Sequence, residues 1–232
     1  IFEVGLEEEL KTHLKSRQLV FTGELDQLAA ATAEFFFVCV PTPQDASGAA
    51  NLSYVLACAN DLSKIAPTDS VVVLKSTVPV GSGERVKKAL AREDVWVASN
   101  PEFLREGRAL NDFMNPDRIV AGATAEEIAI RVLDLYKGID SKKIATSIES
   151  AELVKYSTNA YLAMRLSFVN DLAALCERVG ADVDDVMKGL GSDSRIGNSF
   201  LSPGPGWGGS CFPKDSRALV SVASDFGVDL PL

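Results

Sequence analysis

Short apolar runs alternate with amphipathic segments over the first two thirds of the chain. The apolar runs predict strands at 35–40, 71–76, 95–99, 118–122 and 142–148. The segments before and between them have helical periodicity and predict helices at 3–16, 52–65, 83–91 and 126–137. Strands that alternate with helices indicate βαβ units. The sequence therefore predicts an α/β fold with a mostly parallel sheet.

The pattern changes after residue 149. Residues 150–179 contain neither Gly nor Pro, and their apolar side chains recur at helical spacing, so we predict one long helix that Gly180 ends. Three elements follow it: a helix at 183–190, a loop rich in Gly, Ser and Pro at 191–210, and a helix from Pro213 to about Phe226. The second part of the chain is therefore predicted to be all-helical.

Three consecutive predicted strands run into turns that contain proline and short polar residues. These turns are Pro41-Thr42-Pro43, Ser76-Thr77-Val78-Pro79 and Asn100-Pro101-Glu102. Doubly wound sheets bind ligands outside the carboxyl ends of their strands, which makes the turns candidates for cofactor contacts. The same residue types are common in ordinary turns, and that alternative stays open.

A Rossmann domain opens with a strand and a G-x-G-x-x-G run at the start of a helix. No such run occurs here: Gly81-x-Gly83 follows a strand but has no third glycine, and the chain begins on a predicted helix. We therefore expect a truncated Rossmann-like sheet at 1–148, with its first strands missing, followed by a central helical domain at 149–232.

The composition is that of a soluble globular protein, with 232 residues, 47% hydrophobic and 24% charged. A formal net charge of −9 argues against nucleic-acid binding, and the apolar runs are too short to span a membrane. No basic signal segment opens the chain. The four cysteines have no paired spacing, and neither C-x-x-C nor a His cluster occurs. We expect a cytoplasmic protein without a metal site.

The segment 204–215, GPGWGGSCFPKD, is the most unusual in the chain. Four glycines within six residues allow backbone amides to approach a ligand closely. Pro213 is predicted to take the first position of the last helix, so Cys211 would precede a helix N-terminus, where the dipole favours a thiolate. Lys214 adds a positive charge. We interpret Cys211 as a nucleophile. The other cysteines lie in apolar patterns and are predicted to be buried structural thiols: Cys39, Cys58 and Cys176.

Lys155 and Asn159 are four residues apart on the long predicted helix and share a face. Because their neighbours are apolar, the amine of Lys155 needs a partner or a ligand. A lysine that extends to solvent at the edge of the core is the alternative.

These residues fall in runs that resemble a known family, the UDP-glucose/GDP-mannose 6-dehydrogenases. The runs occur in family order and span nearly all of the chain: VPTP (40–43), KSTVPVGS (75–82), NPEFLREG (100–107), NPDRIVAG (115–122), AELVKYSTNAYLAMR (151–165), DSRIG (193–197) and GPGWGGSCFPKD (204–215). The last run is the most specific of them.

The resemblance implies two successive NAD-dependent oxidations of a sugar C6 alcohol to a carboxylate. Cys211 would attack the aldehyde-level intermediate, and the thiohemiacetal would lose hydride to give a thioester that water hydrolyses. Lys155, with Asn159 and Asp215, would handle protons and stabilise the developing oxyanion.

The resemblance also assigns the residues of the hydrolytic step and the binding residues. Glu102 matches the acid/base of hydrolysis, and Thr77 the residue that positions the water and the nicotinamide. Positions that match NAD contacts are Val40, Pro41, Thr42, Pro43, Ser76, Thr77, Glu106 and Lys214. Positions that match substrate contacts are Glu102, Phe103, Leu104, Arg105, Glu106, Lys155, Asn159, Arg195, Ser202, Pro203, Gly204, Pro205, Gly206, Trp207 and Gly208. Arg195 matches an arginine that reaches across a dimer interface, which implies a homodimer formed through helix 150–179.

Alternatives stay open at this point. The runs NPEFLREG, NPDRIVAG and DSRIG favour UDP-glucose as substrate, with GDP-mannose as the runner-up. We expect the family's base-recognising domain after residue 232, and no turnover by this chain alone. A non-catalytic helical dimer module is one further reading. Another is a β-hydroxyacid dehydrogenase relative, which has a Lys and an Asn on a central helix but needs no nucleophilic cysteine.

Overall fold

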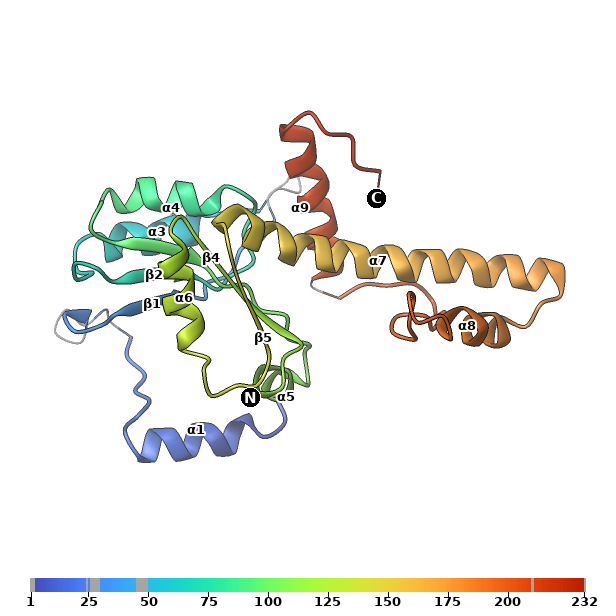
Figure 1. Cartoon of the computed structure of the whole chain (residues 1–232), viewed down its shortest axis with the longest axis horizontal. Helices are drawn as coiled ribbons and strands as arrows, with labels where there is room; N and C mark the ends of the chain where they lie inside the picture. Colours follow the sequence, from blue (N-terminus) through green and yellow to red (C-terminus); the bar gives the residue numbers. More distant parts are fainter. Residues whose placement is uncertain (1–2, 24, 26–29, 45–49, 210, 232) are drawn as a thin grey trace. The chain divides into compact units, whose positions relative to one another are not determined.

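A computed structural model describes residues 3–23, 25, 30–44, 50–209 and 211–231 of the chain (Figure 1). The chain forms two compact units. The first comprises Ile1–Pro43 and Asn51–Lys155, and the second comprises Gln44–Ala50 and Tyr156–Leu232.

The first unit contains a five-stranded sheet whose strand order follows the chain. The strands are β1 (Phe35–Val38), β2 (Val71–Leu74), β3 (Trp96–Ser99), β4 (Arg118–Ala123) and β5 (Lys142–Thr146). All neighbouring pairs are parallel except β3 with β4, which is antiparallel. The predicted α/β fold with a mostly parallel sheet is confirmed.

Helices cover both faces of this sheet (Figure 1). On one face lie α3 (Ser53–Leu62) and α4 (Ser82–Leu90), and on the other lies α6 (Glu126–Asp134). The unit also contains α1 (Leu6–Lys15), which buries no residue, and the short α5 (Ala109–Met114). Side chains alternate between the two faces of a strand, and β2 is buried on both. Val72 and Leu74 pack in a cluster with residues of α3 and α4. Val71 and Val73 pack in a second cluster with residues of α6.

Several boundaries differ from the prediction. Strand β1 ends at Val38, two residues early, so Cys39 lies beyond the ladder and its side chain is exposed. The prediction that Cys39 is buried was therefore wrong, and Cys58 is only half-buried. Strand β5 ends at Thr146 because Ser147 Oγ accepts a hydrogen bond from Ser150 N (3.2 Å), as an N-cap does, and a helix begins at once. Helix α5, of six residues, was not predicted.

The second unit is helical, as predicted. It contains most of α7 (Ile148–Val179), together with α8 (Val183–Gly191) and α9 (Phe212–Asp225). Helix α7 ends before Gly180, whose φ of 74° is a left-handed conformation that glycine adopts without strain. Val169 of α7 packs with Met187 of α8 and Leu201 in a small core. Among the described residues, no helix has both the length and the apolar character that a bilayer crossing requires.

Candidate active site

In the first unit, two of the predicted cofactor turns are tied to each other. Thr42 Oγ1 donates to the carbonyl of Thr77 (2.8 Å), and Ser76 Oγ donates to the carbonyl of Val40 (2.6 Å). The hydroxyls thus hold the turn after β1 against the turn after β2, at the carboxyl ends of parallel strands. This is the edge at which doubly wound sheets bind their ligands.

Lys155, on the first turns of α7, forms an ion pair with Glu102, in the segment after β3. The distance from Lys155 Nζ to Glu102 Oε1 is 2.8 Å, and the lysine side chain is only 6% exposed. Glu102 Oε2 also accepts from the amide of Leu104 (2.6 Å), and the Phe103 ring centroid lies 5.5 Å from the ammonium. The alternative of a lysine that extends to solvent is thereby excluded.

A buried polar cluster that the sequence did not reveal joins the ends of β2 and β3. Lys75 Nζ donates to Asn100 Oδ1 (2.9 Å) and lies 3.3 Å from Tyr136 Oη, which itself donates to Asn100 Oδ1 (2.6 Å). Asn100 Nδ2 donates to the carbonyl of Val120 (2.6 Å). Burial lowers the pKa of Lys75 to about 8, while the negative charge of Glu102 acts in the opposite direction. The cluster therefore places a second cation within electrostatic reach of Glu102.

Glu152 is a second residue that the sequence did not reveal. Its Oε2 accepts from the amide of Gly81 (2.7 Å) and its Oε1 from the amide of Gly83 (2.8 Å), at the N-terminus of α4. Burial raises the pKa of Glu152 to about 7, although the two amide hydrogen bonds act to lower it. The Gly81-x-Gly83 segment, a weak match to a dinucleotide fingerprint, thus already binds an anion of the protein itself.

In the second unit, Cys211 is the N-cap residue of α9 and its side chain is exposed. Pro213 occupies the second helical position, one later than predicted. Asn159 Nδ2 donates to Asp215 Oδ2 (2.5 Å), and Lys214 Nζ lies 2.7 Å from Asp215 Oδ1. Asp215 is buried. One of its carboxylate oxygens accepts from the Asn159 amide, and the other contacts the Lys214 ammonium. The amide of Asp215 donates to the carbonyl of Cys211 (2.8 Å), which joins this network to the cysteine through one helical turn.

The glycine-rich loop is attached to α7 within the second unit. The amide of Gly204 donates to Asn170 Oδ1 (2.9 Å), and Trp207 Nε1 donates to Ser167 Oγ (2.8 Å). The Trp207 ring also meets the ring of Phe212 edge-on, 6.4 Å between centroids. These contacts anchor both ends of the 204–207 segment.

The two predicted substrate arginines are paired with neighbouring carboxylates. Arg195 is exposed and forms an ion pair with Asp193 (2.6 Å), while Arg105 forms one with Asp112 (2.5 Å). The guanidinium of Arg105, helped by its backbone amide, lowers the pKa of Asp112 to about 2. Within the described part of the chain, no three or more His, Cys, Asp and Glu side chains gather as a metal ion would require.

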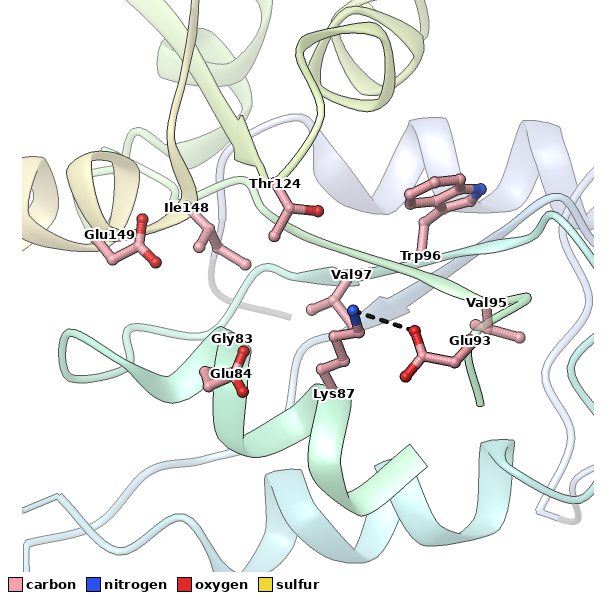
Figure 2. Close-up of a pocket in the computed structure, with 10 residues that line it drawn as sticks. All are labelled: Gly83, Glu84, Lys87, Glu93, Val95, Trp96, Val97, Thr124, Ile148 and Glu149. Carbon is pink, nitrogen blue, oxygen red and sulfur yellow. Dashed lines mark ion pairs between the residues drawn. The ribbon is translucent and has the colours of Figure 1, made fainter. Parts of the chain in front are cut away.

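A small pocket lies elsewhere in the first unit (Figure 2). It has a volume of about 150 Å³ and lies between the start of α4, β3 and the start of α7. Figure 2 shows the Lys87–Glu93 ion pair (3.4 Å) at its rim. None of the residues predicted for catalysis, cofactor or substrate lines this pocket.

Comparison with known proteins gives matches along the whole chain. Residues 1–140 match the NAD binding domain of the UDP-glucose/GDP-mannose dehydrogenase family, and residues 149–232 match the central domain of that family. A UDP-glucose 6-dehydrogenase of Rhizobium meliloti (strain 1021) is 45% identical over 235 residues, which cover 97% of this chain and 54% of that protein. The chain spans about half the length of the curated relatives it matches.

Two solved structures resemble the chain closely. The UDP-glucose dehydrogenase of the hyperthermophilic archaeon Pyrobaculum islandicum has a TM-score of 0.90 at 42% identity, with 99% of this chain and 55% of that chain covered. The GDP-mannose dehydrogenase of Pseudomonas aeruginosa has a TM-score of 0.76 at 28% identity, with the same shares covered.

Proposed function

The chain belongs to the UDP-glucose/GDP-mannose dehydrogenase family, and on this basis we propose that it carries the NAD-binding and catalytic residues of an enzyme that oxidises UDP-glucose to UDP-glucuronate. The overall reaction consumes one UDP-glucose, two NAD⁺ and one water, and it yields UDP-glucuronate with an ionised carboxylate, two NADH and three protons. The observation that carries the proposal is the position of Cys211 at the first turn of α9, beside the Asn159–Asp215–Lys214 network.

The first unit fits a dinucleotide at the carboxyl edge of its parallel strands. There Thr42 and Ser76 hold the turns after β1 and β2 together, and the proposed NAD site lies against these turns. The residues proposed to contact it are Val40, Pro41, Thr42, Pro43, Ser76, Thr77, Glu106 and Lys214. When bound, NAD⁺ accepts the hydride that leaves the sugar C6 in each oxidation.

The residues of the chain supply nucleophile, proton transfer and charge stabilisation. In the second oxidation the Cys211 sulfur adds to the aldehyde carbon, and loss of hydride from the thiohemiacetal gives a thioester. Water then attacks the thioester carbon, the C–S bond breaks and the thiol is regenerated. Lys155 and Asn159 stabilise the developing oxyanion, while Glu102 exchanges the proton of the attacking water. Thr77 positions that water.

The Lys155–Glu102 pair, whose lysine is buried and whose glutamate reaches solvent, suits this division of roles. It holds a cation and the proposed acid/base in one short contact. The Asn159 amide is fixed by Asp215, which orients its donor group before any substrate binds.

Two further properties are proposed with the activity. A homodimer would form through α7, which exposes a row of large apolar side chains on one face: Tyr161, Met164, Phe168, Leu175 and Val179. The exposed Arg195 would reach the substrate of the partner subunit. A cytoplasmic location agrees with four cysteines that form no disulfide.

The test is Cys211→Ser in the whole protein, with the exposed Cys39→Ser as the matched control. Wild type and control are expected to release two NADH per UDP-glucose and to produce UDP-glucuronate, measured by absorbance and mass spectrometry. The Cys211→Ser protein is expected to lose net formation of the carboxylate. Unchanged turnover by this variant contradicts the covalent mechanism. A clear preference of the wild type for GDP-mannose over UDP-glucose contradicts the proposed substrate.

A further inference from the structure

The start of α7 fits tightly into the first unit. A Cβ added at Gly83, on the first turn of α4, would overlap the Cδ1 atom of Ile148. A Cβ added at Gly122, in β4, would overlap the Ser147 carbonyl oxygen and the Ala151 side chain. Figure 2 shows Gly83 and Ile148 on their two helices. The obstacle at Gly122 includes backbone, which cannot rotate away, so the first turn of α7 has little freedom to move toward β4.

Hydrogen bonds of Glu152 also hold the first turn of α7 in place. Its side chain is 2% exposed, and each carboxylate oxygen accepts one backbone amide, from Gly81 and from Gly83. Among the described residues no cation forms an ion pair with it. A buried carboxylate without a counter-ion is unfavourable unless its hydrogen bonds are strong. A Gln side chain would make only one such bond, because it has one acceptor oxygen.

Three polar links then connect three segments of the first unit. Lys75–Asn100 joins the segment after β2 to the segment after β3 (2.9 Å), and Glu102–Lys155 joins the latter to α7 (2.8 Å). Glu152–Gly81 joins α7 back to the end of the segment after β2 (2.7 Å). Thr77 lies in the segment after β2, between Lys75 of the first link and Gly81 of the third link.

We propose that Glu152 is a positioning residue of the catalytic site. Its buried carboxylate fixes the first turns of α7 to Gly81 and Gly83. This attachment holds Lys155 against Glu102 and keeps Thr77 in place. Lys155 follows Glu152 by three residues, less than one helical turn, so a movement of the first turn is transmitted to it directly. The proposal rests on the proposed function, because it assigns a role in that reaction.

The charge state of Glu152 controls the strength of the link. Burial raises the pKa of its carboxyl to about 7, and the nearby Glu149 carboxylate acts in the same direction. The groups packed against it from α4 are the amides of Gly81, Ser82 and Gly83, which favour the carboxylate. As the pH falls through about 7 the carboxyl takes up a proton, and the two amide hydrogen bonds weaken because a neutral acceptor binds less strongly.

The experiment compares Glu152→Gln with Glu149→Gln in the whole protein. Glu149 is the matched control, since it is exposed on the same turn of α7. For Glu152→Gln, kcat is expected to fall by about tenfold or more while KM for the sugar nucleotide stays within about twofold, because misplacement of a positioned group mainly slows the reaction. The wild type is expected to lose kcat as the pH falls through about 7. Glu149→Gln is expected to keep this inflection but at a lower pH, because the Glu149 charge no longer raises the pKa of Glu152, and Glu152→Gln is expected to lack it. Equal kcat and equal pH profiles in the two variants overturn the proposal.

Amide hydrogen exchange at Gly81 and Gly83 gives a readout that needs no activity. Exchange is expected to be faster in Glu152→Gln than in Glu149→Gln, after correction for the intrinsic rate. If the wild type does not oxidise UDP-glucose but exchange responds in this way, the proposed function fails and the link stands. Faster exchange with unchanged kcat overturns the positioning role. If Glu152→Gln does not fold, the wild-type profile decides, and a kcat that is flat through pH 7 overturns the proposal.

Discussion

Lys155 and Glu102 form a 2.8 Å ion pair in which the lysine side chain is 6% exposed and the glutamate side chain is 30% exposed. Loss of the ion pair therefore costs more stability when the buried lysine is left without its partner than when the glutamate is. Glu102→Gln leaves a buried ammonium without its carboxylate, and we expect a loss of about 2–3 kcal/mol in the free energy of unfolding. Lys155→Met leaves a carboxylate that reaches water, and we expect a loss of about 1 kcal/mol or less.

Urea denaturation of both variants beside the wild type checks this order. The control is Lys87→Met, which breaks the exposed Lys87–Glu93 pair and is expected to change stability by less than about 0.5 kcal/mol. Equal losses for Glu102→Gln and Lys155→Met, or a larger loss for Lys155→Met, contradict the argument from burial.

Much of the fold was predictable because its signals are local. Apolar runs such as VVVL, bounded by turn residues, define buried strands, and the uninterrupted periodicity of 150–179 defines a long helix. Helix α5 was missed because its six residues are fewer than two turns. Cys39 was predicted to lie in the core because the apolar run FFFVCV continues beyond Val38, the last residue of β1 that pairs with β2. The point at which the pairing ends depends on the neighbouring strand and cannot be seen in the run itself.

The candidate site was predictable where its residues lie in one short segment: Cys211 was expected just before a helix, and it is the N-cap residue of α9. The contacts of Lys75 and Glu152 were not predictable, because each depends on partners far away in the chain. In the sequence, Glu152 looks like any polar residue of a helix, because its contact with Gly81 joins residues that are 71 positions apart. Lys75 finds Asn100 and Tyr136 only when the sheet and α6 assemble. A Lys that directly follows a wholly apolar strand was the available signal.

Cys211 is expected to react faster with iodoacetamide than any other cysteine of the chain. Its thiol is exposed at the N-terminus of α9, where backbone amides stabilise negative charge. Cys39 is the comparison that is also exposed but does not cap a helix, and partial burial raises the pKa of its thiol. Burial raises the pKa of the Cys58 thiol, and Cys176 is buried, so both are expected to react more slowly. Mass spectrometry of tryptic peptides over a time course gives the four rates, and Cys39 labelling as fast as Cys211 would remove the support for activation.

Lys75 is expected to give the protein a rising stability in mildly alkaline solution. Its pKa is about 8 in the folded protein and 10.5 in the unfolded reference. Between these values the unfolded chain binds more protons, so the free energy of unfolding increases with pH from about 8 to about 10.5, by at most about 3 kcal/mol from this group. Lys75→Met is expected to abolish that increase, while Asn100 Oδ1 keeps its bond from Tyr136 (2.6 Å).

The measurement is urea denaturation at a series of pH values for wild type, Lys75→Met and Lys88→Met. Lys88 is exposed on α4 and serves as the control that retains the increase. A difference between wild type and Lys75→Met that does not change with pH would contradict the assignment to Lys75.

Gly122→Ala is expected to destabilise the first unit by about 1–3 kcal/mol or more, because overpacking against backbone cannot relax by a rotamer change. The new methyl group would overlap the Ser147 carbonyl oxygen at the start of α7. Gly138→Ala is the control, since nothing lies within 4 Å of its added Cβ. Thermal denaturation of both variants tests this, and equal melting temperatures would show that α7 is not held tightly at Gly122.

The row of exposed apolar residues on α7 predicts a dimer interface, and a single charge within that row is expected to weaken the dimer. Tyr161, Met164, Phe168, Leu175 and Val179 are spaced by three, four or seven residues, so they form one narrow stripe along the helix. A second copy of the chain offers the same stripe, and two such surfaces are complementary across a two-fold axis. Phe168→Glu is expected to raise the dimer dissociation constant by about tenfold or more, because it places a charge at the centre of an apolar interface.

Ala174→Glu introduces the same side chain at an exposed position about 120° away around the helix, and it is expected to leave the dimer intact. Sedimentation analysis across a concentration series gives the dissociation constant of the wild type and of both variants. A wild type that stays monomeric at all concentrations, or a Phe168→Glu protein that associates like Ala174→Glu, would contradict dimerisation through α7. A dimer that Ala174→Glu weakens as much as Phe168→Glu would place the interface on a broader surface than the stripe.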